Sequence, residues 1–178
     1  MSIKLVLALV VGLLPIVAMA EPAPKISPTD QAALQHRHDV NLMEIEMGKL
    51  AIDRATAPVQ KYAAALVKDH EKADKEVKAL ARSKGIKLTE HAPGPDHDKM
   101  MASMDKLKPL QGAAFDKEYL PMMVDGHTAE VGKITTSIGQ TSDAQVRALL
   151  TKAKPVVERH AEQARALLPP AAASAMKP

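Results

Sequence analysis

The 178-residue chain contains no cysteine and no tryptophan, and its only aromatic residues are two tyrosines and one phenylalanine. Without cysteine there can be no disulfide, no thiolate nucleophile and no thiolate metal ligand. So few aromatic side chains leave little to stack on nucleic-acid bases. The sequence also lacks a Gly-x-Ser-x-Gly pattern and a glycine-rich phosphate loop. These absences favour a binding or structural module over an enzyme.

The charge balance is mildly basic, with a formal net charge of +3 and a pI near 9.0. Lysine and arginine alternate with aspartate and glutamate along the chain and do not form a stripe. A basic stripe or patch is the usual mark of a nucleic-acid-binding surface. We therefore expect no nucleic-acid partner.

The N-terminal segment has the pattern of an export signal. Lys4 precedes an apolar run over residues 5–18, and the small residues Ala18 and Ala20 flank a cleavage site. The run is shorter than the roughly 20 residues that a spanning helix needs. The sequence therefore predicts that residues 1–20 are removed, that no membrane span remains and that the protein is periplasmic.

Beyond the signal, the sequence predicts an extended lead over 21–29, one helical domain over 30–168 and a disordered tail over 169–178. Apolar residues recur at helical spacing in four long segments of this domain. These segments cover about 28–56, 58–85, 113–138 and 143–167. The pattern Ser142-Asp143-Ala144-Gln145 resembles a capping box that starts the last of them.

The helical pattern breaks between Gly85 and Gly112. Pro93-Gly94-Pro95 marks a loop there, and a short helix is predicted over 96–107. A connection of this length allows the third long helix to run parallel to the second. The predicted fold is therefore all-α, an antiparallel four-helix bundle with a long crossover that contains a short helix.

Ionisable side chains fall on the apolar stripes of these helices. His70, His127 and His160 lie on three different helices, Glu44 lies on the first, and Glu130 follows His127 by three residues. Helix bundles build buried metal sites from inward histidines and carboxylates of this kind. We predict these five residues as ligands of a divalent iron, zinc or copper ion.

Positions along the helices predict which ligands meet. Glu44 and His70 both lie about 13 residues, or roughly 20 Å, from the turn near Pro58. His160 lies about six residues further from its turn than His127, which is roughly 9 Å along the axis. This offset argues against His160 as a ligand, so His160 is counted only as the fifth member of the predicted set. In the alternative interpretation, the histidines are structural and bond Glu44, tyrosines or backbone carbonyls.

Two other metal sites can be weighed from the sequence. A di-iron centre needs Glu-x-x-His on two helices, but valines precede His70 and His160 at the glutamate position. On the short predicted helix, His97, Met100, Met101 and Met104 are predicted to share one side, with His91 nearby, and thioethers select Cu(I). His36 and His38 diverge on their helix and are expected at the surface.

Four motifs carry a resemblance to a known family: Leu-Met-Glu44-Ile-Glu, Leu-Val-Lys-Asp69-His70, Met-Val-Asp-Gly-His127 and Pro155-Val-Val-Glu-Arg-His160. Together they resemble an exported bacterial family known as domain of unknown function 4142. The resemblance covers about residues 30–168 and implies a ferritin-like four-helix fold, export, and site positions at Glu44 and the three histidines. The chain departs from the family at Gly126, where members tend to have aspartate.

Two functions follow as hypotheses. The first is a periplasmic ligand or metal binder that acts in envelope stress, which requires the inward histidines to converge. The second is an interaction scaffold for an envelope protein, which requires an exposed apolar patch, expected near residues 100–107. The sequence leaves the metal, the partner and the oligomeric state open.

Overall fold

The computed structural model describes residues 26–169, which form five helices and no strand. The helices are α1 (Pro28–Arg54), α2 (Ala57–Ser83), α3 (Pro95–Leu107), α4 (Gly112–Gln140) and α5 (Ala144–Leu167). Their boundaries agree with the predicted ones within about two residues. The predicted signal at 1–20, residues 21–25 of the lead and residues 170–178 of the tail lie outside the described residues.

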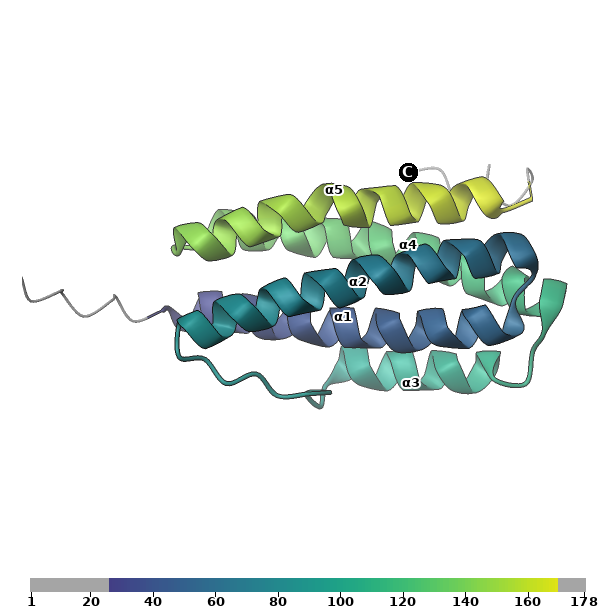
Figure 1. Ribbon diagram of the computed structural model, residues 1–178, viewed down its shortest axis with the longest axis horizontal. Coiled ribbons are helices and arrows are strands. Elements are labelled where there is room, and N and C mark those ends of the chain that lie inside the picture. Colours follow the sequence, from purple (N-terminus) through teal and green to yellow (C-terminus); the bar gives the residue numbers. More distant parts are fainter. Residues whose placement is uncertain (1–25, 170–178) are drawn as a thin grey trace, which may run out of the picture.

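The four long helices form a bundle of two hairpins, α1 with α2 and α4 with α5 (Figure 1). The segment over 84–111, including α3, carries the chain back along the bundle, so α4 runs in the same direction as α2. The short helix α3 contacts α1 and α4. The predicted ferritin-like antiparallel four-helix bundle with a long crossover is confirmed.

A buried aspartate joins the start of α1 to the turn between α4 and α5. The Asp30 carboxylate accepts hydrogen bonds from the hydroxyls of Ser27 and Ser142, both at 2.6 Å, and from the backbone N–H groups of Ser142 and Asp143. Because Ser142 is engaged by Asp30, the cap of α5 is Asp143, which accepts from Gln145 N and Val146 N. The predicted capping box at Ser142 is therefore wrong.

The interior of the bundle is divided along its length into two apolar clusters. One cluster surrounds Phe115, Tyr119 and Leu66, and the other surrounds Leu34 and Ile134. Between the two clusters lies a group of buried polar side chains: Arg37, Asn41, His70, His127, Glu130 and His160. This polar layer, which lies midway along the long helices, contains the predicted site.

Candidate metal centre

Three histidines from three helices meet inside the polar layer. His70 of α2, His127 of α4 and His160 of α5 are each no more than 3% exposed. Their ring centroids lie 6.0 Å apart for His70 and His127, 5.2 Å for His70 and His160, and 5.4 Å for His127 and His160. One ligand nitrogen from each ring lies within 4.8 Å of one from each of the others. The predicted inward direction of the three rings is confirmed.

Each ring uses one nitrogen to bond a group of the protein. His70 Nδ1 lies 2.9 Å from Asn41 Oδ1, and His127 Nδ1 lies 2.8 Å from the Met123 carbonyl oxygen. His160 Nε2 lies 3.0 Å from Asp69 Oδ2. A carbonyl and a carboxylate can only accept, so His127 and His160 donate at these nitrogens.

The same reasoning assigns the proton on His70. Asn41 Oδ1 also receives Nη2 of Arg37 at 3.3 Å, and a guanidinium can only donate. The side-chain atom of Asn41 that faces both groups is therefore its oxygen. His70 must donate through Nδ1, which leaves a lone pair on Nε2.

One nitrogen of each ring is left without a partner. His70 Nε2, His127 Nε2 and His160 Nδ1 are buried and have no hydrogen-bond partner in the described part of the chain. Burial lowers the pKa of His70 well below its usual value, and burial lowers that of His160 to about 4 in spite of its bond to Asp69. These two rings are neutral at pH 7, so their lone pairs are available to a Lewis acid.

Glu44 lies at the edge of the histidine cluster. Its Oε2 is buried without a hydrogen-bond partner and lies 3.9 Å from His127 Nε2. Burial raises the pKa of this carboxyl, and the nearby charge of Glu130 raises it further, against the attraction of His127. A cation between Glu44 and the rings would relieve this cost of burial.

Glu130 is not brought to the histidines. Its carboxylate binds Arg37 Nη1 at 2.8 Å and His36 Nε2 at 3.0 Å. Burial alone would raise the pKa of Glu130, but these two partners hold it below its usual value. Glu130 therefore reaches the cluster only indirectly, through Arg37 and Asn41.

The axial offset expected for His160 is wrong, because the structure brings its ring together with those of His70 and His127. In the structure His127 lies 13 residues before Gln140, the last residue of α4, whereas His160 lies 16 residues after Ala144, the first of α5. This difference of three residues corresponds to only about 4.5 Å of rise. The offset is therefore about half of the expected one, and the three rings meet.

The prediction that His36 and His38 lie at the surface is wrong for His38. Its side chain is 2% exposed, and Nδ1 lies 2.6 Å from Oδ1 of Asp74 on α2. His36 is half-buried and binds Glu130. Both histidines diverge as expected, but each meets a carboxylate on a neighbouring helix.

The methionines of α3 do not share one side. Met100 is 8% exposed and Met101 is 39% exposed, and Met104 packs against the apolar core. Adjacent helical residues diverge, so the predicted cluster of three thioethers with His97 is wrong. The expected apolar patch at 100–107 is also not formed, because Met100 and Leu107 face inward.

A cleft of about 560 Å³ reaches Glu44 from the surface between α1, α3 and α4. Flexible thioether side chains form much of its wall, and we call it the methionine cleft. Its methionines are Met43, Met47, Met100, Met122 and Met123. Methionine is unbranched and fills irregular space without a fixed shape, so such a wall can adapt to an entering ion or molecule.

Sequence reasoning missed three residues that orient the site, Arg37, Asn41 and Asp69. A signal for the first two was present: Arg37, Asn41 and Glu44 recur at intervals of four and three, which places them on one face of α1. Asp69 precedes His70 but binds His160, and only the packing of α2 against α5 reveals that contact.

A family described as "Domain of unknown function (DUF4142)" matches residues 16–167 of the chain. A search of curated proteins gave no match. Among solved structures, the crystal structure of a DUF305 fragment from Deinococcus radiodurans is similar with a TM-score of 0.72 and 15% identity. The match covers 81% of this chain and 97% of that one, and it supports the fold. No helix over 26–169 is long and apolar enough to cross a bilayer.

Proposed function

Because the chain belongs to the DUF4142 family, whose description names no activity, we propose its function from the geometry of the site. We propose that this helical bundle holds one divalent transition-metal ion. His70, His127 and His160 would bind the ion, with Glu44 as the fourth ligand. Two observations carry the proposal: one ring nitrogen from each histidine lies within 4.8 Å of one from each of the others, and each buried ring has one nitrogen without a hydrogen-bond partner in the described chain.

The distances between the three ring nitrogens allow them to bind one ion after a small movement of the side chains. Points no more than 4.8 Å apart all lie within about 2.8 Å of a common point, and zinc binds imidazole nitrogen at about 2.0–2.1 Å. Each nitrogen must therefore move by less than about 1 Å, which side-chain rotation in a neutral ring can supply. The bundle need not rearrange.

The outer contacts are those that metal-binding histidines use. Such a histidine gives its second N–H to a carboxylate, a carbonyl or an amide oxygen, which fixes the ring and the tautomer. Asp69, the Met123 carbonyl and Asn41 supply these three acceptors. If the histidines were only structural, these bonds would be explained, but the three buried ring nitrogens without a partner would not.

The ligand set favours retention of the ion over catalysis. Three imidazoles and one carboxylate complete a tetrahedral shell, whereas catalytic zinc sites keep a position for water or substrate. Imidazole with carboxylate suits zinc, iron or copper. We therefore propose a metal-binding module of the cell envelope.

Calorimetric titration of the metal-free protein with Zn²⁺ tests this proposal. We expect one ion per chain with a dissociation constant of a micromolar or below, and a loss of at least tenfold in affinity for His160→Ala. His91→Ala is the matched control, because His91 is half-exposed and lies outside the cluster. Circular dichroism checks that each variant folds. Binding weaker than micromolar, or equal binding by His160→Ala, would contradict the proposal.

We propose further that residues 1–20 direct export and are then removed. Support comes from the apolar run, the small residues before Glu21 and the absence of cysteine, which suits an oxidising compartment. Expression of the full chain in a bacterium tests this. The periplasmic fraction should contain a protein whose measured mass is that of a chain starting at Glu21. Intact 178-residue chain in the cytoplasm would contradict it.

A further inference from the structure

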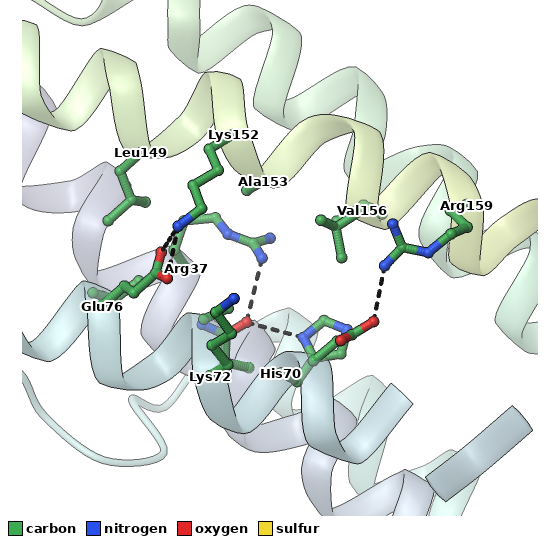
Figure 2. A pocket seen from close by; sticks show the side chains of 14 residues that line it. Arg37, His70, Lys72, Glu76, Leu149, Lys152, Ala153, Val156 and Arg159 are labelled. Atoms are coloured by element: carbon green, nitrogen blue, oxygen red, sulfur yellow. Dashed lines mark hydrogen bonds and ion pairs between the residues drawn. The ribbon is translucent and has the colours of Figure 1, made fainter. Parts of the chain in front are cut away.

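A second cavity, of about 200 Å³, lies where α2 and α5 face each other over α1 (Figure 2). We call it the α2–α5 pocket. Much of its wall is aliphatic, formed by Val77, Leu149, Val156 and Val157. His70 also lines it, so the pocket reaches the polar layer between different helices from those of the methionine cleft. Aliphatic walls with a few polar groups at one end are typical of small-molecule sites.

The polar end of the pocket is formed by two buried side chains of α1. Arg37 and Asn41 are 2% and 0% exposed, and both line the pocket, as Figure 2 shows for Arg37. Arg37 gives Nη1 to Glu130 and Nη2 to Asn41, but its Nε has no partner in the described chain. Asn41 Nδ2 also lacks one. Two buried donors therefore lack an acceptor, which is rare in folded proteins.

The charges around the pocket are predominantly positive. Four cations and two carboxylates line it: Arg37, Lys72, Lys152, Arg159, Asp69 and Glu76. Lys152 pairs with Glu76 at 2.7 Å and Arg159 with Asp69 at 2.9 Å, and Arg37 pairs with Glu130 from outside the pocket. The remaining cation, Lys72, lines the pocket and forms none of the ion pairs found within 26–169. The lining thus attracts an acceptor that carries negative charge.

We propose that the α2–α5 pocket binds a small aliphatic monocarboxylate. Its carboxylate accepts the N–H groups of Arg37 Nε and Asn41 Nδ2, and its hydrocarbon body lies against the valines and Leu149. The volume is below the range of drug-sized sites, which points to a ligand smaller than a drug molecule. This site goes beyond the proposed metal function, and its donors do not depend on an ion.

The proposal can be tested on the metal-free protein by NMR titration with isovalerate and isovaleramide. The two molecules share a shape, and only the first carries a charge. We expect isovalerate to shift resonances at the α2–α5 pocket in a saturable way, and isovaleramide to bind at least tenfold more weakly. Inorganic phosphate, which has no apolar body, should also bind at least tenfold more weakly.

Two variants test the location of binding. Ala153→Phe fills the α2–α5 pocket and should weaken isovalerate binding at least tenfold. Ala129→Phe is the matched control, because Ala129 lines the methionine cleft. Arg37→Lys keeps a cation opposite Glu130 but removes the Nε–H donor, and it should also lose at least tenfold. If Arg37→Lys does not fold, the two alanine variants decide.

Several results would overturn the proposal. They are equal binding of isovalerate and isovaleramide, binding of phosphate as tight as that of isovalerate, unchanged binding by Ala153→Phe, and no saturable response at tens of millimolar isovalerate. Because all titrations use metal-free protein, their failure would leave the zinc titration unaffected, and failure of the zinc titration would leave this site standing.

Discussion

Arg37 and His70 donate hydrogen bonds to the same atom, Oδ1 of Asn41, at 3.3 and 2.9 Å. The guanidinium fixes the orientation of the Asn41 amide, and the amide in turn fixes the tautomer of the imidazole. A residue that cannot change its protonation state thus determines which nitrogen of His70 has a lone pair. The candidate centre is prepared by α1 although none of its three histidines belongs to α1.

Removal of the Asn41 oxygen should therefore weaken metal binding. Asn41→Leu leaves His70 free to rotate and to change tautomer, and loss of such an outer contact commonly lowers metal affinity about 10–100-fold. Asn41→Asp keeps an acceptor at this position and should lose less. Zinc calorimetry on both variants checks this, and equal affinities for Asn41→Leu and the parent protein would refute the role given to Asn41.

Glu44→Gln should have opposite effects on the metal-free and the metal-bound protein. Oε2 of Glu44 is buried without a partner, so replacing the carboxylate should stabilise the metal-free protein by about 1 kcal/mol. The same change removes the proposed fourth ligand and should weaken zinc binding at least tenfold. Urea unfolding in chelator and zinc calorimetry measure the two effects. A loss of stability in chelator would contradict the first expectation.

Gly48 lies where α1 packs tightly against α2. A Cβ at this position would lie 2.6 Å from Cγ2 of Val67 and 3.2 Å from Cδ2 of Leu66. Valine is stiff at χ1 and cannot easily move away. We expect Gly48→Ala to destabilise the protein by about 1–2 kcal/mol, because overpacking outweighs the gain in helix propensity.

Two further variants isolate the cause of that destabilisation in urea unfolding. Gly132→Ala, where a Cβ meets nothing within 4 Å, should be neutral or stabilising by up to about 1 kcal/mol. Adding Val67→Ala to Gly48→Ala should recover part of the loss, as expected for two groups in contact. A Gly48→Ala protein as stable as the parent would show that the helices can separate at little cost.

Asp30 should give the stability of the bundle a recognisable pH dependence. Burial raises the pKa of Asp30, but bonds from Ser142, Ser27 and the backbone outweigh it, so its net pKa lies below 3.8. A lowered pKa stabilises the fold above about pH 3.8, and this contribution is lost as the pH falls through the folded value. Asp30→Asn should cost about 2 kcal/mol at neutral pH, and its difference from the parent should shrink in acid.

The exposed Asp53 provides the control for this measurement. Asp53→Asn should leave the free energy of unfolding within about 0.5 kcal/mol of the parent at every pH. Urea unfolding between neutral and acidic pH measures all three proteins. A difference between Asp30→Asn and the parent that stayed constant into acid would show that Asp30 contributes through shape and not through charge.

The sequence predicted the helices well because local chemistry determines them. Pro58 opens α2, Pro93-Gly94-Pro95 interrupts the crossover, and Gly85 follows the end of α2 with a φ of +69°, which glycine adopts without strain. The spacing of apolar residues also predicted the inward direction of His70, His127 and His160, because this spacing is a local property of each helix. These features depend on neighbours within one or two helical turns.

The features that the sequence did not predict depend on packing between helices. The position of His160 along the bundle axis depends on how far α5 is shifted along α4. The burial of His38 depends on its contact with Asp74, which lies on another helix. Ser142 fits a helix-capping pattern, yet its hydroxyl donates a hydrogen bond to Asp30, which lies 112 residues earlier in the chain. Such relationships arise only when helices are placed side by side.

The two openings to the polar layer differ in the charge that surrounds them. The methionine cleft carries four carboxylates and two ammonium groups: Glu44, Asp96, Asp125, Glu130, Lys99 and Lys133. The α2–α5 pocket has the reverse proportion. This difference in charge would favour a cation at the opening toward Glu44 and an anion at the opening toward Arg37. If both proposed sites are real, ions of opposite sign would reach the centre of the bundle by separate entrances.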